Sequence, residues 1–182
     1  MTFRSKQKIR FGDIDRAGIV YYPRFLHYFH VALEEFFDES LGIEYPTVIN
    51  HHRVGLPTVH LETDFQGPLK YGDNIEVEVT VLTLGSTSIK FGYQVFRKGE
   101  DSPRVTGHNV TVCVDMNTFE KKSIPEFLRD RLAKHLNWLI QPSAKLEIQA
   151  LLCEWVSEYI SPPVHFVHAS VAGGVRSYIF TP

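Results

Sequence analysis

The sequence predicts an α+β protein in which one long helix packs against an antiparallel sheet. The first observation is a segment around residues 22–40 whose apolar side chains recur at helical spacing. The second is a series of segments after residue 58 in which apolar and polar side chains alternate. Short turns containing Gly, Pro and Asp separate these segments, which favours antiparallel pairing. A helix with a wide apolar face has to be covered, and a long antiparallel sheet can cover it.

The helix is predicted to run from about residue 22 to residue 40. Pro23 suits its first turn, because a proline there removes an N–H group that has no partner within the helix. Gly42 can adopt the left-handed conformation that often ends a helix. The apolar positions at helical spacing are Leu26, Phe29, Leu33, Phe36 and Phe37. We expect most of the last four to lie in the core, with His27 and His30 on the polar edge of the helix.

The sheet is predicted to contain an N-terminal strand and four longer ones. The predicted strands cover residues 6–11, 59–65, 75–81, 89–95 and 110–116. In the last strand, Val110 and Val112 are expected on the buried face, and Asn109, Thr111 and Cys113 on the polar face, because successive side chains point to opposite faces. Two further helices are predicted, at about residues 124–138 and 143–160.

Composition indicates a globular protein with one main domain. The chain has 182 residues, of which 43% are hydrophobic, and a formal net charge of -2. This charge gives no support to nucleic acid or an anionic membrane as a partner. No apolar run is long enough for a membrane span or a signal peptide. Cys113 and Cys153 are isolated thiols, which favours a cytoplasmic location. We expect a domain at residues 1–138 and an extension at residues 139–182, helical and then irregular or a hairpin, packed on the same domain.

Three segments resemble the 4-hydroxybenzoyl-CoA thioesterase family. Residues 11–25, FGDIDRAGIVYYPRF, resemble the family's active-site segment. Residues 54–57, VGLP, resemble the loop that enters its second strand, and residues 68–73, PLKYGD, are similar to its Gly-Asp turn. The resemblance covers about residues 2–138. It implies the hotdog fold, in which a curved antiparallel sheet of about five strands wraps a long central helix, here with an extra C-terminal helical segment.

The resemblance implies an acyl-CoA thioesterase and gives Asp15 the catalytic role. The Asp15 carboxylate would attack the thioester carbonyl or activate a water molecule, and the sequence leaves both routes open. The backbone N–H group of Tyr22, at the start of the helix, would polarise the carbonyl oxygen. Gly18 would let the loop approach the substrate closely. Asp13 is interpreted as a structural residue that bonds loop amides.

Substrate contacts are predicted on both sides of the helix start. The residues expected to bind substrate are Ile19, Val20, Gly55, Leu56 and Pro57. Leu56 replaces a threonine that lines the family's aromatic pocket, so the acyl group stays open between aromatic and short or medium chains. The family's basic turn for the CoA phosphates is absent from residues 85–88. Four other cationic residues are candidates for that role, namely Lys70, Arg97, Lys98 and Arg104.

No metal and no cofactor beyond the CoA of the substrate is expected. His27 and His30 lie one helical turn apart, as His165 and His168 could, but neither pair has a third ligand at a recognisable spacing. Sites of this family resemble clefts between subunits, so a homodimer or homotetramer is predicted. Two alternatives stay open: a thioesterase that acts on acyl carrier protein, and a non-catalytic module that binds acyl-CoA.

Overall fold

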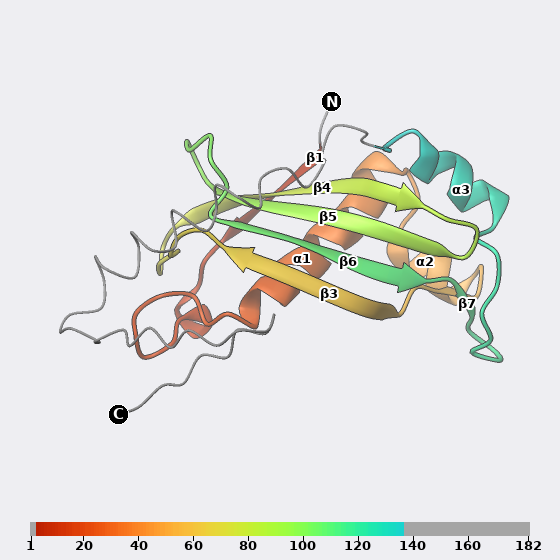
Figure 1. The fold of residues 1–182 in the computed structure, drawn as a ribbon, viewed down its shortest axis with the longest axis horizontal. Helices are drawn as coiled ribbons and strands as arrows, with labels where there is room; N and C mark the ends of the chain where they lie inside the picture. Colours follow the sequence, from red (N-terminus) through yellow and green to blue (C-terminus); the bar gives the residue numbers. More distant parts are fainter. Residues whose placement is uncertain (1–2, 137–182) are drawn as a thin grey trace, which may run out of the picture.

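The computed structural model describes residues 3–136 and has an antiparallel sheet laid across one helix (Figure 1). The sheet has the strand order β1-β4-β5-β6-β3. Its strands are β1 Phe3–Lys8, β3 Thr58–Phe65, β4 Asn74–Leu84, β5 Ser88–Arg97 and β6 Val105–Val112. The short strands β2 (Val54–Gly55) and β7 (Val114–Asp115) form a separate pair. The helices are α1 Arg24–Glu35, α2 Tyr45–Asn50 and α3 Glu126–Ala133. This arrangement fits the predicted hotdog fold.

The main helix begins slightly later than predicted and changes its winding before it ends. Pro23 is the N-cap of α1 and lies outside the first turn. After Glu35, the chain continues as a π-helical segment, Phe36–Ser40. Phe36 and Phe37 are both fully buried there. A π turn contains more residues than an α turn, which allows these two neighbouring rings to reach the core together.

The core lies between α1 and the inner face of the sheet. Phe29 stacks on Tyr93 of β5 with ring centroids 4.5 Å apart, and Phe37 packs against Phe91. Phe29, Leu33, Phe36 and Phe37 are all at most 3% exposed, so the expectation that they form the core is confirmed. Each such side chain contributes roughly 1.5–3 kcal/mol through its removal from water.

The prediction of which side of β6 faces the core was wrong. Asn109 and Thr111 are buried, whereas Val110 and Val112 are only partly buried. In the register, Asn109 pairs with Phe91 and Thr111 with Ile89. Side chains of paired residues share a face of the sheet, so these polar residues follow Phe91 and Ile89 into the interior.

Other element boundaries also differ from the prediction. The first strand spans Phe3–Lys8, and residues 11–13 form a 3₁₀ turn. The first strand ends where its partner β4 begins, at Asn74. Beyond that point, the Ile9 N–H group donates to the carbonyl of Asp73 at 2.9 Å, and Asp73 follows the turn at residues 71–72. Helix α2 was not predicted, and α3 ends at Ala133. The predicted helix at 143–160, Cys153, His165, His168 and the whole 139–182 extension lie outside the described residues. Within residues 3–136, no helix is long and apolar enough to cross a membrane.

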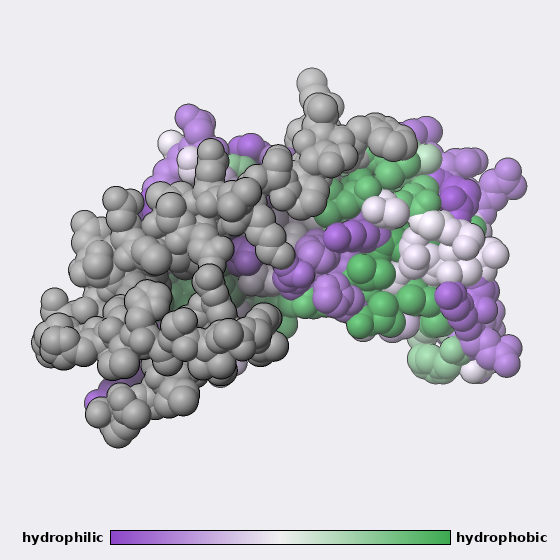
Figure 2. All heavy atoms as spheres, in the orientation of Figure 1, coloured by the Kyte–Doolittle hydropathy of each residue, from purple (hydrophilic) through white to green (hydrophobic). Residues whose placement is uncertain are grey.

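Strand β3 forms one edge of the sheet and carries exposed apolar side chains. Val59 is 62% exposed, and Leu61 and Phe65 are each 40% exposed. Figure 2 shows hydrophobic and hydrophilic side chains together on the uncovered part of the visible face. The backbone of β3 pairs only with β6 among the described strands. An edge of this kind is suited to pairing with a further strand.

Candidate active site

The Asp15 carboxylate lies in the loop between the 3₁₀ turn Phe11–Asp13 and α1. Its Oδ1 atom accepts a hydrogen bond from the Ala17 N–H group at 2.8 Å. Within residues 3–136, no group donates to its Oδ2 atom. The Asp15 N–H group donates to the Ile19 carbonyl at 2.9 Å, which closes the loop. One carboxylate oxygen is therefore oriented, and the other is available to a substrate or a water molecule.

Gly18, Ile19 and Val20 shape this loop. Gly18 has a φ of 79°, a left-handed conformation that glycine adopts without strain. A Cβ atom there would meet no atom within 4 Å, so the backbone conformation, and not crowding, calls for glycine. Val20 is buried, and its N–H group donates to the Leu69 carbonyl at 2.9 Å. Ile19 bridges to Lys70 in the same segment. Direct substrate contact by these residues stays a prediction.

Asp13 is engaged on both carboxylate oxygens. Its Oδ2 atom accepts a hydrogen bond from the Arg10 N–H group at 2.7 Å, and its Oδ1 atom lies 3.6 Å from Arg24 Nε. Its side chain is nearly buried. Burial, and then this carboxylate, raise the pKa of the neighbouring Tyr28. The expected bond from a backbone amide to Asp13 is confirmed, and its structural role stays a prediction.

The Tyr22 N–H group, just before α1, donates to no acceptor among the described residues. The preceding N–H group, of Tyr21, is bound to the Asp13 carbonyl at 2.8 Å, and that of Arg24 to the Tyr21 carbonyl at 2.8 Å. Pro23 has no N–H group. Tyr22 is 65% exposed, so the free donor is near the surface. It lies near the positive end of the helix dipole, where negative charge is stabilised.

A cavity of about 380 Å³ follows α1 away from this point. Its apolar lining includes Leu26, Phe29 and Leu33 of α1, together with Leu56 and Leu61. Leu26 is four residues after Tyr22, so the cavity begins about one helical turn from the free N–H group. The seven residue steps from Leu26 to Leu33 span roughly 10 Å of helix. The space suits an aromatic ring system or an acyl chain of moderate length.

Polar groups on the sheet form one wall of the same cavity. The Tyr93 hydroxyl donates to Asn109 Oδ1 at 3.1 Å, and Asn109 Nδ2 donates to Thr58 Oγ1 at 3.0 Å. Burial, and then the neighbouring Tyr45, raise the pKa of Tyr93, so its hydroxyl stays protonated. Sequence reasoning missed this wall because it placed Asn109 on the polar face. The sequence held no signal for this wall, because the pairing of Asn109 with Phe91 is set by the register of the whole sheet.

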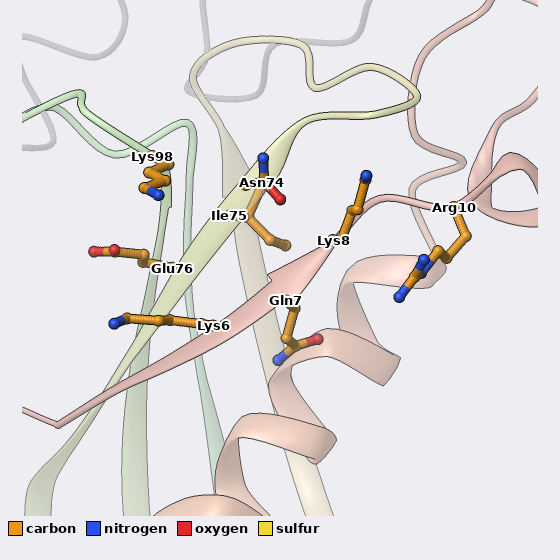
Figure 3. Close-up of a pocket in the computed structure, with 8 residues that line it drawn as sticks. All are labelled: Lys6, Gln7, Lys8, Arg10, Asn74, Ile75, Glu76 and Lys98. Atoms are coloured by element: carbon orange, nitrogen blue, oxygen red, sulfur yellow. The ribbon is translucent and has the colours of Figure 1, made fainter.

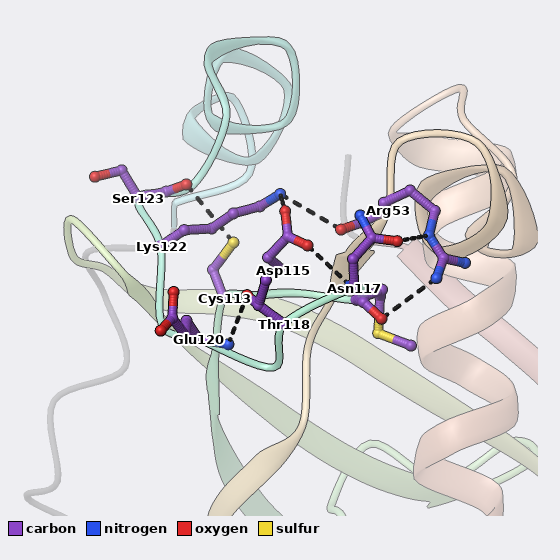
Figure 4. A network of polar contacts seen from close by, with 9 residues as sticks. Arg53, Cys113, Asp115, Asn117, Thr118, Glu120, Lys122 and Ser123 are labelled. Carbon is purple, nitrogen blue, oxygen red and sulfur yellow. Dashed lines mark hydrogen bonds and ion pairs between the residues drawn. The ribbon is translucent and has the colours of Figure 1, made fainter.

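Residues 55–57 follow Arg53, whose side chain contacts a turn after β7 (Figure 4). Arg53 Nε donates to Asn117 Oδ1 at 3.0 Å, and Gly55 pairs with Val114. A Cβ atom on Gly55 would lie 2.5 Å from Met116 Sδ, so the residue is closely packed. Leu56 lines the cavity, whereas Gly55 and the exposed Pro57 do not. Of these three residues, which were all predicted to bind substrate, the structure brings only Leu56 to the cavity.

Comparison with known proteins identifies the family. A profile of the thioesterase-like superfamily matches residues 9–132. The chain belongs to this superfamily. It is 33% identical over 131 residues to a 1,4-dihydroxy-2-naphthoyl-CoA hydrolase from Synechococcus elongatus, covering 71% of this chain and 94% of the relative. It is 37% identical over 142 residues to an enzyme of the same name from Crocosphaera subtropica, covering 76% and 95%.

Solved structures agree with this assignment. A 1,4-dihydroxy-2-naphthoyl-CoA thioesterase from Synechocystis has the same fold, with a TM-score of 0.66 at 23% identity over 78% of this chain and all of that one. A gentisyl-coenzyme A thioesterase matches with a TM-score of 0.63 at 25% identity, covering 70% and 99%. The chain is a thioester hydrolase of the hotdog type. The relatives support this broader family and not specifically its 4-hydroxybenzoyl-CoA branch.

The four cationic candidates for CoA phosphates are not equivalent in the thioesterase. Arg97 pairs with Asp73 at 3.4 Å, and Arg104 makes a two-point contact with Glu100. The hydrogen bond from Arg104 lowers the pKa of Glu100. Both arginines are therefore held by carboxylates of their own chain. Lys98 lines a second cavity and pairs with no carboxylate within the described part of the chain.

One cluster on the outer face of the thioesterase has donor types that could hold a metal. The ligand atoms of His60, Glu62 and His108 all lie within 4.8 Å of one another. Burial, and then Lys90, lower the pKa of His108, which favours the neutral imidazole that binds metals. The sequence did not suggest this group, because the sheet register brings His108 opposite Glu62. His27 and His30 are both exposed, and His30 instead contacts Glu34 at 3.1 Å.

Proposed function

We propose that this thioesterase hydrolyses an acyl-CoA to the free acid and CoA, with Asp15 as the catalytic carboxylate. The observation that carries the proposal is the loop before α1. It holds a carboxylate with one unengaged oxygen and, seven residues later, a backbone N–H group without an acceptor among residues 3–136. A nucleophile or base and a donor for the developing negative charge are the two requirements of thioester cleavage.

Two routes are compatible with this arrangement. In the first, Asp15 Oδ2 attacks the carbonyl carbon, the C–S bond breaks, and the mixed anhydride that forms is then hydrolysed by water. In the second, the carboxylate takes a proton from water while the water oxygen attacks the carbonyl carbon. The proton then passes to the departing CoA thiolate. In both routes, the oxygen of the tetrahedral intermediate is bound by the Tyr22 N–H group.

The acyl group is proposed to occupy the cavity along α1. Leu26, Leu33 and Leu56 would contact its apolar part. Asn109 and Thr58 offer polar atoms that could meet a hydroxyl substituent. Relatives named as 1,4-dihydroxy-2-naphthoyl-CoA hydrolases make a hydroxylated aromatic acyl group the first candidate.

The cavity also suggests a role for association between subunits. Leu26 and Leu61 line it and are 43% and 40% exposed. Leu61 belongs to β3, whose outer side pairs with no strand of residues 3–136 and can pair with the β3 strand of a second copy. Such a dimer would cover the open side of the cavity and exclude water from the acyl group. This supports the prediction of a homodimer or homotetramer.

The experiment is release of free thiol from a panel of aromatic and aliphatic acyl-CoAs. The panel includes 1,4-dihydroxy-2-naphthoyl-CoA, the compound in the relatives' names. We expect the wild type to hydrolyse at least one aromatic member and Asp15→Ala to hydrolyse none at a comparable rate. Full activity in Asp15→Ala would reject the catalytic role of this residue. Binding of acyl-CoA without turnover by the wild type would favour the non-catalytic module instead.

A further inference from the structure

A second cavity, of about 460 Å³, lies where β1, the start of β4 and the end of β5 meet (Figure 3). Four cationic side chains line it, those of Lys6, Lys8, Arg10 and Lys98, together with Asn74 and Glu76. Neither the proposed catalytic step nor the acyl cavity uses any of them. The chain as a whole has a net charge of -2, so this concentration of positive charge is local.

Sheet register gathers these residues from distant parts of the sequence. Lys8 lies opposite Asn74, and Lys6 lies opposite Glu76. The backbone N–H group of Lys98 donates to the Asn74 carbonyl at 2.8 Å, which places Lys98 beside Asn74 on its other side. Lys6 and Lys8 are two residues apart on one strand and therefore share a face. The two strands and the residue after β5 thus bring Lys6, Lys8 and Lys98 to the lining of one cavity.

The positive charge of this cavity is not neutralised within the described residues. Its one carboxylate, Glu76, lies 3.2 Å from Arg4 and is already paired. No carboxylate of residues 3–136 lies within 4.0 Å of the charged groups of Lys6, Lys8, Arg10 or Lys98. A concave site lined by unpaired cations attracts anions, and phosphate groups are the usual ligands of such sites.

The cavity is joined to the Asp15 loop through one short segment. Arg10 lines the cavity, and the next residues form the 3₁₀ turn that leads to Asp15. Ile9 exchanges hydrogen bonds with Gly72 and Asp73, and the same turn contains Lys70, which bridges to Ile19 of the loop. The basic cavity and the Asp15 loop are thus connected through residues 9–13 and the 70–73 turn.

We infer that this cavity binds the phosphate groups of the CoA nucleotide while the thioester lies at Asp15. This inference rests on the proposed function and identifies the part of the substrate that the acyl cavity cannot hold. CoA has a long pantetheine arm between its thiol and its phosphates, so two separate sites on one end of the domain suit it. The concave shape suits a small nucleotide better than the broad acidic surface of a carrier protein.

The test uses a double variant, Lys8→Gln with Lys98→Gln, and a control of equal charge change, Lys121→Gln with Lys134→Gln. The control lysines are exposed and lie at the opposite end of the domain, on the segment after β7 and at the end of α3. We expect the first variant to weaken CoA binding and to raise KM for the best acyl-CoA by about tenfold. The control should leave both quantities unchanged. Calorimetry with CoA measures binding without turnover.

A thioester of pantetheine with the same acyl group distinguishes phosphate binding from a structural effect. This compound lacks the nucleotide, so the two lysine substitutions should leave its kcat/KM unchanged. The KM for acyl-CoA should also rise with salt in the wild type and much less in the variant. An equal loss on both substrates, or no loss on either, would overturn the inference. So would a loss confined to acyl groups carried by acyl carrier protein.

The outcomes separate this inference from the proposed function. If the wild type hydrolyses no thioester but CoA binding depends on Lys8 and Lys98, hydrolysis is rejected and the phosphate site stands. If acyl-CoA is hydrolysed and the double variant binds CoA like the wild type, hydrolysis stands and the phosphate site is rejected.

Discussion

The loop around Asp15 and the turn around Asp115 lie at opposite ends of the sheet and contain similar charged residues (Figure 1). In the turn, Asp115 Oδ1 accepts a hydrogen bond from the Asn117 N–H group at 2.8 Å, and Oδ2 lies 3.0 Å from Lys122 Nζ. Figure 4 shows Arg53 reaching the same turn through Asn117. In the loop, Asp15 has one oxygen without a partner among the described residues. Lys8 lines the nearby cavity, and it forms no ion pair with a carboxylate of residues 3–136.

The difference between these regions lies in how their charges are satisfied. The hydrogen bond from Asn117, and then the contact with Lys122, lower the pKa of Asp115, so its carboxylate is held for structure. At the other end of the sheet, one oxygen of Asp15 and the ammonium groups of Lys8 and Lys98 have no charged partner among residues 3–136. Charged side chains that their own chain leaves unpaired are the ones available to a charged ligand. Substitutions at matched positions can test this distinction.

The largest expected effect is on turnover by Asp15→Asn. The amide can neither attack as a carboxylate nor accept a proton efficiently, so kcat should fall about a thousandfold. Thiol release from the best acyl-CoA measures it. The matched change, Asp115→Asn, should leave kcat within about twofold of the wild type, because it lies far from the site. Comparable losses in the two variants would contradict the distinction between the regions.

Asp13→Ala should lower stability more than any other single change in the loop. It leaves the Arg10 N–H group without its 2.7 Å acceptor and Arg24 without its nearby carboxylate. We expect a loss of about 3 kcal/mol in the free energy of unfolding, measured by urea denaturation. Asp101→Ala, in the exposed turn after β5, is the control and should have almost no effect. An unaltered midpoint for Asp13→Ala would show that the loop does not depend on this residue.

Gly55→Ala tests how the turn positions the acyl cavity. The new Cβ atom would lie 2.5 Å from Met116 Sδ and 2.9 Å from Val114 Cγ2, so the side chains of Met116 and Val114 must move. The expected cost is about 2 kcal/mol of stability. A shift in acyl preference should accompany it, since Leu56 is the next residue. Gly12→Ala is a suitable control, because its Cβ atom would meet no atom within 4 Å. Equal melting temperatures for the two variants would contradict the packing argument.

The smallest effect is the pH dependence that Asp115 adds to stability. Its pKa is lowered in the folded protein, so its contribution is complete above the ordinary value of 3.8 and is lost as pH falls through the folded value. The wild type should melt slightly above Asp115→Asn at neutral pH, and the difference should shrink below about pH 4. Because the carboxylate is exposed, the difference should be small. A gap that widens on acidification would contradict this sign.

Several features of this protein follow from its sequence alone. Apolar spacing at residues 29, 33, 36 and 37 predicts the buried helix, because a helix that displays such a face must pack against another layer. Alternation in β4 and β5 predicts two strands and their inner faces correctly, since Val77 and Phe91 are buried. The motif around Asp15 indicates the thioesterase-like superfamily, but not which branch of it the chain belongs to. These are local properties, determined by neighbours within a few residues.

Only the tertiary structure decided the features that depend on pairing between distant segments. The register between β5 and β6 turned Asn109 inward and made it part of the wall of the cavity along α1. The pairing of β1 with β4, and the bond from Lys98 to Asn74, gathered the cationic cavity from residues up to 92 positions apart. Strand register is set by the contacts of the whole sheet, and a shift of one residue exchanges its two faces. The sequence therefore determined the Asp15 loop, and the sheet decided which side chains surround it.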